Sequence, residues 1–194
     1  MTRPKTISDA ELLAVARDLF RAHGHAVSTR QVAEKAGISE GVLYQRFGNK
    51  NDLFFAAMAP NAPDIEKVLG PDEPTDDAHA YVGAVVLRLA DYFGEVLPLA
   101  LRLITHPSFD RDSLARAALS STSLQQGLAR RLAWFESRKQ VRKGSAEATA
   151  QLLVSLAHDW ALGNVMSQRT TKRTHELSAM VEIVWAGAAV KPKG

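Results

Sequence analysis

Apolar residues recur at helical spacing along most of the chain, and strand-like alternation of apolar and polar residues occurs nowhere in it. In the first helical stretch, Leu12, Ala16, Leu19 and Phe20 fall at positions i, i+4, i+7 and i+8 and share one face. Capping residues and glycines divide the amino-terminal part into short helices. The predicted starts are Ser8, Ser28, Ser39 and Asn49, and the first three helices are predicted to stop at Gly24, Gly37 and Gly48. The pattern predicts an all-α fold.

The remainder of the chain is predicted to be helical after an irregular acidic connection from Pro60 to Asp77, which we expect to be a loop. The predicted helices cover residues 76–104, 111–120, 123–143, 146–168 and 174–189. Pro98 is expected to kink or break the first of them, because proline lacks the N–H that a helix interior uses. Residues 191–194 are expected to fray.

Two of the short helices are joined by a tight turn at Gly37 and Ile38, and together they form a helix-turn-helix pattern. The second helix of this motif enters the major groove of DNA, where each base pair presents its own donors and acceptors. Val42, Leu43 and Phe47 are expected to face the core. The outward positions are then Glu40, Gly41, Tyr44, Gln45 and Arg46. A small helical subdomain with a solvated polar face is the alternative interpretation.

The amino-acid composition excludes several classes of protein. The 194 residues are 46% apolar and 23% charged, which is typical of a globular protein. The sequence has no cysteine, which excludes disulfides, thiolate zinc sites, iron–sulfur clusters and cysteine nucleophiles. No secretory signal is recognised at the start, and charged residues interrupt the most apolar stretch, from Ala84 to Ile104. We therefore expect a soluble, cytoplasmic protein that does not associate with a membrane.

The formal net charge of +3 is unevenly distributed. Residues 1–50 carry eight lysines and arginines against five acidic residues, whereas residues 51–80 carry one against seven. A basic amino-terminal block before an acidic stretch is a weak indication of a nucleic-acid-binding head.

A larger set of residues at fixed offsets makes the amino-terminal pattern specific. The set is Ala16, Leu19, Phe20, Gly24, Ser28, Thr29, Val32, Ala33, Ala36, Gly37, Ile38, Ser39, Gly41, Leu43, Tyr44, Phe47, Lys50 and Leu53. With these residues, the stretch from Ile7 to Phe55 resembles the DNA-binding domain of the tetracycline-repressor (TetR/AcrR) family of transcriptional regulators. The resemblance covers about a quarter of the chain.

The resemblance implies roles for individual residues. The implied phosphate contacts are Thr29, Tyr44 and Lys50, with Ser39 at the helix start. The implied base readers are Arg30, Glu40, Gly41 and Gln45. Arg30 could grip guanine through a two-pronged hydrogen bond, and Gln45 could pair with adenine.

Two positions depart from the family pattern. Arg46 stands where the family often has histidine, and it should add a phosphate contact. Glu40 places a negative charge near the DNA backbone. It either accepts a hydrogen bond from a cytosine amino group, tunes specificity in another way, or only satisfies the start of its helix.

The resemblance also implies that the rest of the chain senses a small molecule and dimerises. We expect a DNA-binding domain over residues 1–52 and a ligand-binding and dimerisation domain over residues 53–194. The apolar stripes of the last two predicted helices suit a four-helix dimer seam and a monomer core equally well. Because one recognition helix reads few bases, a two-fold dimer on palindromic half-sites is expected.

Aromatic and apolar residues of this second part could line an effector cavity, with His106 or His158 as a polar anchor. The candidates are Phe93, Leu97, Leu101, Phe109, Trp134, Phe135 and Trp160. Plain core packing is the alternative for each of them.

The sequence thus favours a homodimeric repressor that binds a double-stranded DNA operator and is released by a small apolar or amphipathic effector. An architectural DNA binder without ligand control is the main alternative. The stretch from Gly37 to Gly41 matches the nucleophile motif G-x-S-x-G, but no strand precedes it, and no other catalytic constellation is recognised. The six histidines include no i, i+4 pair, and glycine-rich nucleotide motifs are missing, so we expect neither metal nor cofactor. An interaction module that has lost DNA binding is disfavoured by Thr29, Tyr44 and Lys50.

Overall fold

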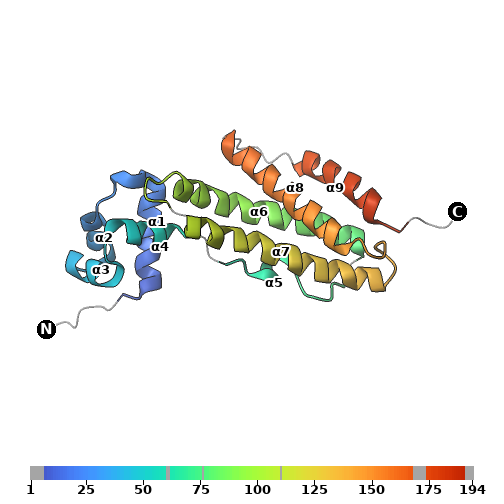
Figure 1. Ribbon diagram of the computed structural model, residues 1–194, viewed down its shortest axis with the longest axis horizontal. Helices are drawn as coiled ribbons and strands as arrows, with labels where there is room; N and C mark the ends of the chain where they lie inside the picture. The colour runs from blue at the N-terminus through green and yellow to red at the C-terminus, as the bar shows by residue number, and fades with distance from the viewer. Residues whose placement is uncertain (1–6, 60–61, 76, 110, 168–173, 191–194) are drawn as a thin grey trace. The chain divides into compact units, whose positions relative to one another are not determined.

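The computed structural model of the chain describes residues 7–59, 62–75, 77–109, 111–167 and 174–190, and their side chains except those of residues 111–120. Its elements are α1 (Asp9–His23), a 3-10 turn η1 (Gly24–Ala26), α2 (Thr29–Ala36), α3 (Glu40–Phe47), α4 (Lys50–Met58), α5 (Ile65–Leu69), α6 (Ala78–Ile104), α7 (Arg111–Ser137), α8 (Ala146–Met166) and α9 (Thr174–Ala188) (Figure 1). Val141 and Ala189 form an isolated antiparallel bridge, and the described residues contain no strand. The predicted all-α fold is confirmed.

The chain divides into two compact units. The first is Met1–Pro60 with Leu99–Asp110, and the second is Asn61–Pro98 with Arg111–Gly194. Helix α6 therefore contributes residues to both units. The functional division expected between residues 52 and 53 stays a prediction.

Local capping forms the helices of the first unit. The Ser8 side chain accepts a hydrogen bond from the Glu11 N–H while the Glu11 carboxylate accepts one from the Ser8 N–H, and Ser28 and Gln31 repeat this arrangement on α2. Gly37 ends α2 with a φ of 70°, a left-handed conformation that favours glycine. The predicted starts of α1 to α4 are confirmed.

A single apolar core holds the first unit together. It is lined by Leu12, Ala16, Phe20, Val27, Val32, Ala33, Leu43, Leu53, Phe54, Ala57, Met58, Leu99 and Leu103. Arg102 Nη1 also donates a 2.7 Å hydrogen bond to the Phe20 carbonyl at the end of α1. The end of α6 is thus fixed to α1 by both apolar and polar contacts.

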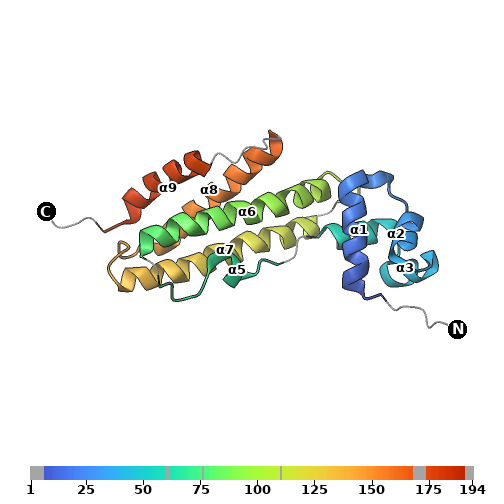
Figure 2. The ribbon, with the colours of Figure 1, turned by 180° about the vertical axis from the view of Figure 1, so that it is seen from behind.

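The second unit is a helical bundle in which α6 and α7 run side by side and α8 and α9 lie adjacent (Figures 1 and 2). Every helix from α5 to α9 contributes to one core, as Leu69, Val85, Leu128, Leu153 and Val181 illustrate. The amphipathic spacing along these helices predicted such burial.

Two sequence predictions for this part are wrong. The polar run that was expected to separate two helices near residue 121 contains neither glycine nor proline, and α7 continues through it to Ser137. The acidic connection contains a short helix, α5, which Asp64 caps by accepting from the Lys67 N–H. Pro98 lies inside α6 and does not break the helix, and the alternative expectation of a kink stays a prediction. The tail of residues 191–194 lies outside the described residues.

Candidate nucleic-acid interface

The turn between α2 and α3 fixes the direction of α3. The Ile38 N–H donates to the Ala33 carbonyl over 3.0 Å, and the Gly37 N–H donates to the Glu34 carbonyl over 3.2 Å. Ser39 then starts α3 by accepting from the Val42 N–H. These bonds satisfy the carbonyl groups at the end of one helix and the N–H groups at the start of the next. The helix-turn-helix geometry follows from this local arrangement.

Several predicted DNA contacts lie on the exposed surface of α2 and α3. Arg30, Gly41 and Gln45 are exposed, and the Tyr44 residue is 43% exposed although it is large and aromatic. The Leu43 side chain between them is fully buried. Leu43 is therefore buried as the spacing predicts, whereas Val42 and Phe47, also predicted to face the core, are only partly buried.

Thr29, Glu40 and Tyr44 form a hydrogen-bonded triad that links the starts of α2 and α3. The Thr29 hydroxyl donates to Glu40 Oε1, and it also lies 3.0 Å from the Tyr44 hydroxyl. The Tyr44 hydroxyl is 3.5 Å from the same Glu40 oxygen. Thr29 and Tyr44, the residues implied to contact phosphates, are thus hydrogen-bonded to Glu40, which was implied to read a base.

Arg30 is held by an exposed ion pair with Glu34. Its Nε lies 2.9 Å from Glu34 Oε1, one helical turn along α2. The hydrogen bond and the charge of Glu34 raise the pKa of Arg30. The pair is solvent-exposed, with side-chain exposures of 79% and 63%, so water screens it and Arg30 can exchange Glu34 for another acceptor at little cost.

Arg46 and Lys50 both contact other parts of the first unit. Arg46 Nη1 donates to the Ile7 carbonyl over 2.7 Å and to Asp9 Oδ1 over 3.1 Å. Lys50, at the start of α4, donates from Nζ to the His25 carbonyl over 2.7 Å. These contacts join residues far apart in the chain, and the sequence pattern gave no sign of them.

His106, predicted as an effector anchor, lies in the first unit among aromatic rings. Its ring centroid is 4.8 Å from Phe54, 4.8 Å from Phe55 and 4.5 Å from His25. Burial, followed by the nearby charges of His25 and Lys50, lowers the pKa of His106. The Ser108 N–H donates to Nδ1, which therefore carries no proton. The ring is neutral in this arrangement.

The predicted effector residues are divided between the two units. Leu101, His106 and Phe109 belong to the first unit, whereas Phe93, Leu97, Trp134, Phe135 and Trp160 belong to the second. Of the latter group, Phe93, Leu97 and Phe135 are buried in the core, and the two tryptophans are partly buried against it. Trp134 Nε1 is buried and has no hydrogen-bond partner. The effector assignment stays a prediction.

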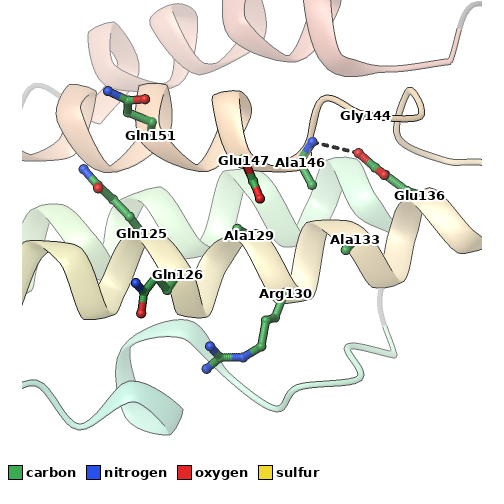
Figure 3. A pocket seen from close by; sticks show the side chains of 10 residues that line it. All are labelled: Gln125, Gln126, Ala129, Arg130, Ala133, Glu136, Gly144, Ala146, Glu147 and Gln151. Carbon is green, nitrogen blue, oxygen red and sulfur yellow. Dashed lines mark hydrogen bonds between the residues drawn. The ribbon is translucent and has the colours of Figure 1, made fainter.

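The second unit has an open hollow of about 810 Å³ between α7 and the start of α8 (Figure 3). Its lining is mixed in polarity and comprises Gln125, Gln126, Ala129, Arg130, Ala133, Glu136, Gly144, Ala146, Glu147 and Gln151. Glu136 accepts a 2.7 Å hydrogen bond from the Ala146 N–H beside it. None of the predicted effector residues lines this hollow.

The described residues offer neither a metal site nor a membrane span. They contain no group of three or more His, Asp or Glu side chains placed to hold a metal ion. None of their helices is long and apolar enough to cross a bilayer.

Comparison with known proteins matches the amino-terminal part of the chain to a family of regulators. The model for "Bacterial regulatory proteins, tetR family" matches residues 12–57. The HTH-type transcriptional repressor Rv3405c of Mycobacterium tuberculosis is 29% identical over 93 residues, which are 47% of this chain and 45% of the relative. The chain thus matches about half the length of its curated relatives.

Solved structures match over nearly the whole chain. A putative TetR-family transcriptional regulator from Mesorhizobium loti is 21% identical, with a TM-score of 0.74 over 94% of this chain and 96% of that one. FadR from Bacillus subtilis, solved in complex with stearoyl-CoA, is 14% identical, with a TM-score of 0.68 over 93% and 99%. These likenesses show a shared fold.

A helix-turn-helix unit joined to a helical bundle defines the class of protein. Over residues 12–57, the amino-terminal unit matches the tetR family of bacterial regulatory proteins. The relatives named above are regulators rather than enzymes.

Proposed function

We propose that the chain is a DNA-binding transcriptional repressor that reads a palindromic operator as a homodimer and is released by a small-molecule effector. The observation that carries the proposal is the exposed side of α2 and α3, where Arg30, Tyr44 and Gln45 project from helices whose other side is buried in the core. Arginine and glutamine are the side chains that read guanine and adenine edges in a major groove.

Lys50 and Arg46 would contact the phosphates, although each has a partner within the protein. Lys50 donates to a backbone carbonyl at the start of α4, where the N–H groups of the helix also favour an anion. An Nζ with three hydrogens can keep this bond and still donate to a phosphate. Arg46 has five N–H donors, of which the contacts to Ile7 and Asp9 use one nitrogen.

Substitutions distinguish base reading from phosphate contact. Replacing Arg30 or Gln45 by alanine should relax the preference at particular base pairs by about 1–3 kcal/mol. Lys50→Ala should weaken all duplexes alike and reduce the salt slope by about 1, while Lys143→Ala, an exposed change in the second unit, should do neither. If the wild type binds DNA with no sequence preference, the protein is an architectural binder instead.

The dimer seam we propose consists of exposed apolar residues on α8 and α9. Leu152 is 57% exposed, Met166 69%, Met180 43% and Ile183 76%. Such an apolar face is unusual on a monomer surface and suits a second copy of the same two helices. The apolar stripe of α9 formed by Leu177, Val181 and Ala188 is buried in the second unit instead.

The proposed release by an effector follows from linkage. A molecule that binds the second unit more tightly in a DNA-incompetent state lowers operator affinity by that difference in binding free energy. The fold shared with a regulator solved with stearoyl-CoA supports an amphipathic effector with a long apolar chain. A candidate that binds the protein but leaves operator affinity unchanged is not its effector.

A further inference from the structure

We propose that Glu40 occupies, in the DNA-free protein, the place that a DNA phosphate takes on binding, and that a phosphate must displace it. This inference rests on the proposed DNA-binding function. The phosphate donors concerned are Thr29 and Tyr44, whose hydroxyls both lie within hydrogen-bond distance of Glu40 Oε1. Glu40 is thereby a residue that determines specificity through competition, in addition to any base contact it makes.

Counting hydrogens shows why the two hydroxyls cannot serve both anions. Each hydroxyl has one hydrogen to donate. The Thr29 hydrogen goes to Glu40 Oε1. The Tyr44 hydrogen is directed either to the Thr29 oxygen at 3.0 Å or to Glu40 at 3.5 Å. The Thr29 hydroxyl cannot donate to a phosphate until the Glu40 carboxylate leaves, and the Tyr44 hydroxyl must turn away from its contacts with both to do so.

The position of the carboxylate explains why it resembles a bound phosphate. Thr29 is the first residue of α2 and Glu40 is the first residue of α3. The starts of helices carry partial positive charge and stabilise anions, whether carboxylate or phosphate. The contact between Thr29 and Glu40 thus joins the two helix starts. A phosphate arriving there while Glu40 stays would meet a like charge at close range.

Displacement gives Glu40 a second role at the DNA. In the first turn of the recognition helix, a freed carboxylate can accept only from a base that offers an amino group, which cytosine and adenine do in the major groove. Opposite a guanine edge, which presents only acceptors, the carboxylate finds no donor. Glu40 should therefore lower affinity for wrong sequences more than for the operator.

The first test compares Glu40→Ala with wild type by fluorescence anisotropy on two duplexes, the operator recovered by selection and a scrambled duplex of equal length. We expect Glu40→Ala to bind the scrambled duplex about tenfold more tightly and the operator no more than about threefold more tightly. Asp18→Ala, which removes an exposed carboxylate from α1, should change both affinities equally and by less than about threefold. Equal effects of Glu40→Ala on both duplexes would overturn the inference.

A double-mutant cycle separates displacement from simple charge repulsion. Thr29→Val with Tyr44→Phe keeps the shapes of both side chains and removes both hydroxyls. If Glu40 acts by occupying those hydroxyls, the gain from Glu40→Ala should fall to less than about twofold in this background. An undiminished tenfold gain would mean that Glu40 only repels DNA.

Further controls keep the result interpretable. Circular dichroism verifies that each variant is folded, and Glu40→Gln, which keeps an acceptor oxygen but loses the charge, replaces Glu40→Ala if the latter unfolds. Its expected gain on the scrambled duplex is about threefold, and no gain would overturn the inference. If the wild type binds no duplex even at low salt, the proposed function fails. If the wild type reads its operator and the Glu40 variants show no gain, only the present inference fails.

Discussion

The guanidinium of Arg131 joins α7 to the end of α5, and its loss should destabilise the second unit strongly. Nε lies 3.0 Å from the carbonyl oxygens of both Gly70 and Pro71, and Nη1 lies 3.0 Å from the Gly127 oxygen and 3.0 Å from Asp72 Oδ1. The side chain is only 3% exposed. Replacing it by methionine keeps most of the volume and removes every donor.

The expected cost follows from the acceptors that are left behind. Buried carbonyls that lose their donor cost about 1–3 kcal/mol each. Three carbonyls lose this donor, but the contacts to Gly70 and Pro71 are only partly buried and the Gly127 carbonyl stays within the helical ladder of α7, so we take the lower end of that range. Arg131→Met should lower the free energy of unfolding by about 3 kcal/mol.

Tryptophan fluorescence during urea unfolding measures this effect in the relevant unit. All three tryptophans, Trp134, Trp160 and Trp185, belong to the second unit, so the signal does not report on the first. At a slope of about 2 kcal/mol per molar urea, the midpoint should fall by about 1.5 M.

Arg130→Met is the matched control, because Arg130 is the preceding residue and lines the open hollow. It should change the free energy of unfolding by no more than about 0.5 kcal/mol. If Arg131→Met costs no more than this control, the buried guanidinium does not stabilise the unit as we have argued.

Three further predictions concern packing, pH and assembly. A Cβ at Gly127 would lie 2.8 Å from Leu69 Cδ1, so Gly127→Ala should destabilise the second unit by about 1–3 kcal/mol in the same urea assay. Gly94 has open space around it, so Gly94→Ala should stabilise the unit by up to about 1 kcal/mol. The reverse order of the two effects would contradict the packing. Burial lowers the pKa of His106, so the unfolded chain binds a proton more readily than the folded chain, and stability should fall as the pH drops below about 6.5. Thermal unfolding followed by circular dichroism measures this fall, which should be smaller in His106→Gln. An unchanged pH dependence in this variant would refute the prediction. Ile183→Glu should convert the proposed dimer to a monomer in sedimentation velocity, whereas Arg130→Glu should not. An Ile183→Glu protein that still sediments as a dimer would show that the dimer interface lies elsewhere.

The elements that the sequence predicted well are those set by local contacts. The capping pairs of Ser8 with Glu11 and Ser28 with Gln31 form as their three-residue spacing implies. Gly37 adopts the left-handed conformation that a helix stop requires. Interactions within one turn leave their pattern directly in the sequence, so the helix-turn-helix could be predicted residue by residue.

The elements that the sequence predicted poorly depend on the rest of the fold. A run of serines and threonine after residue 119 weakens a helix only slightly, and the buried residues Leu124, Leu128 and Leu132 outweigh it, so α7 is continuous. The short helix α5 forms where Val68 and Leu69 find a core to enter. Its residues lie among prolines and acidic side chains that predict a loop.

The proposed site shows the same division. The exposed positions of α3 follow from helical spacing, because Leu43 must face the core. The partners of Arg46 lie 37 and 39 residues away along the chain, and Thr29 lies 11 residues from Glu40, so no spacing rule predicts these contacts. The eight predicted effector residues were chosen for apolar character alone, which does not separate a cavity lining from a core.

The central claim, that this protein reads a DNA sequence through α2 and α3, is tested most directly by selecting bound duplexes from a random DNA pool. The selection uses refolded, effector-free protein at about 0.15 M salt, where nonspecific phosphate binding is weak. Our account predicts an inverted repeat whose half-sites lie one helical turn, or a multiple of it, apart. Recovery of duplexes with no common sequence would contradict it.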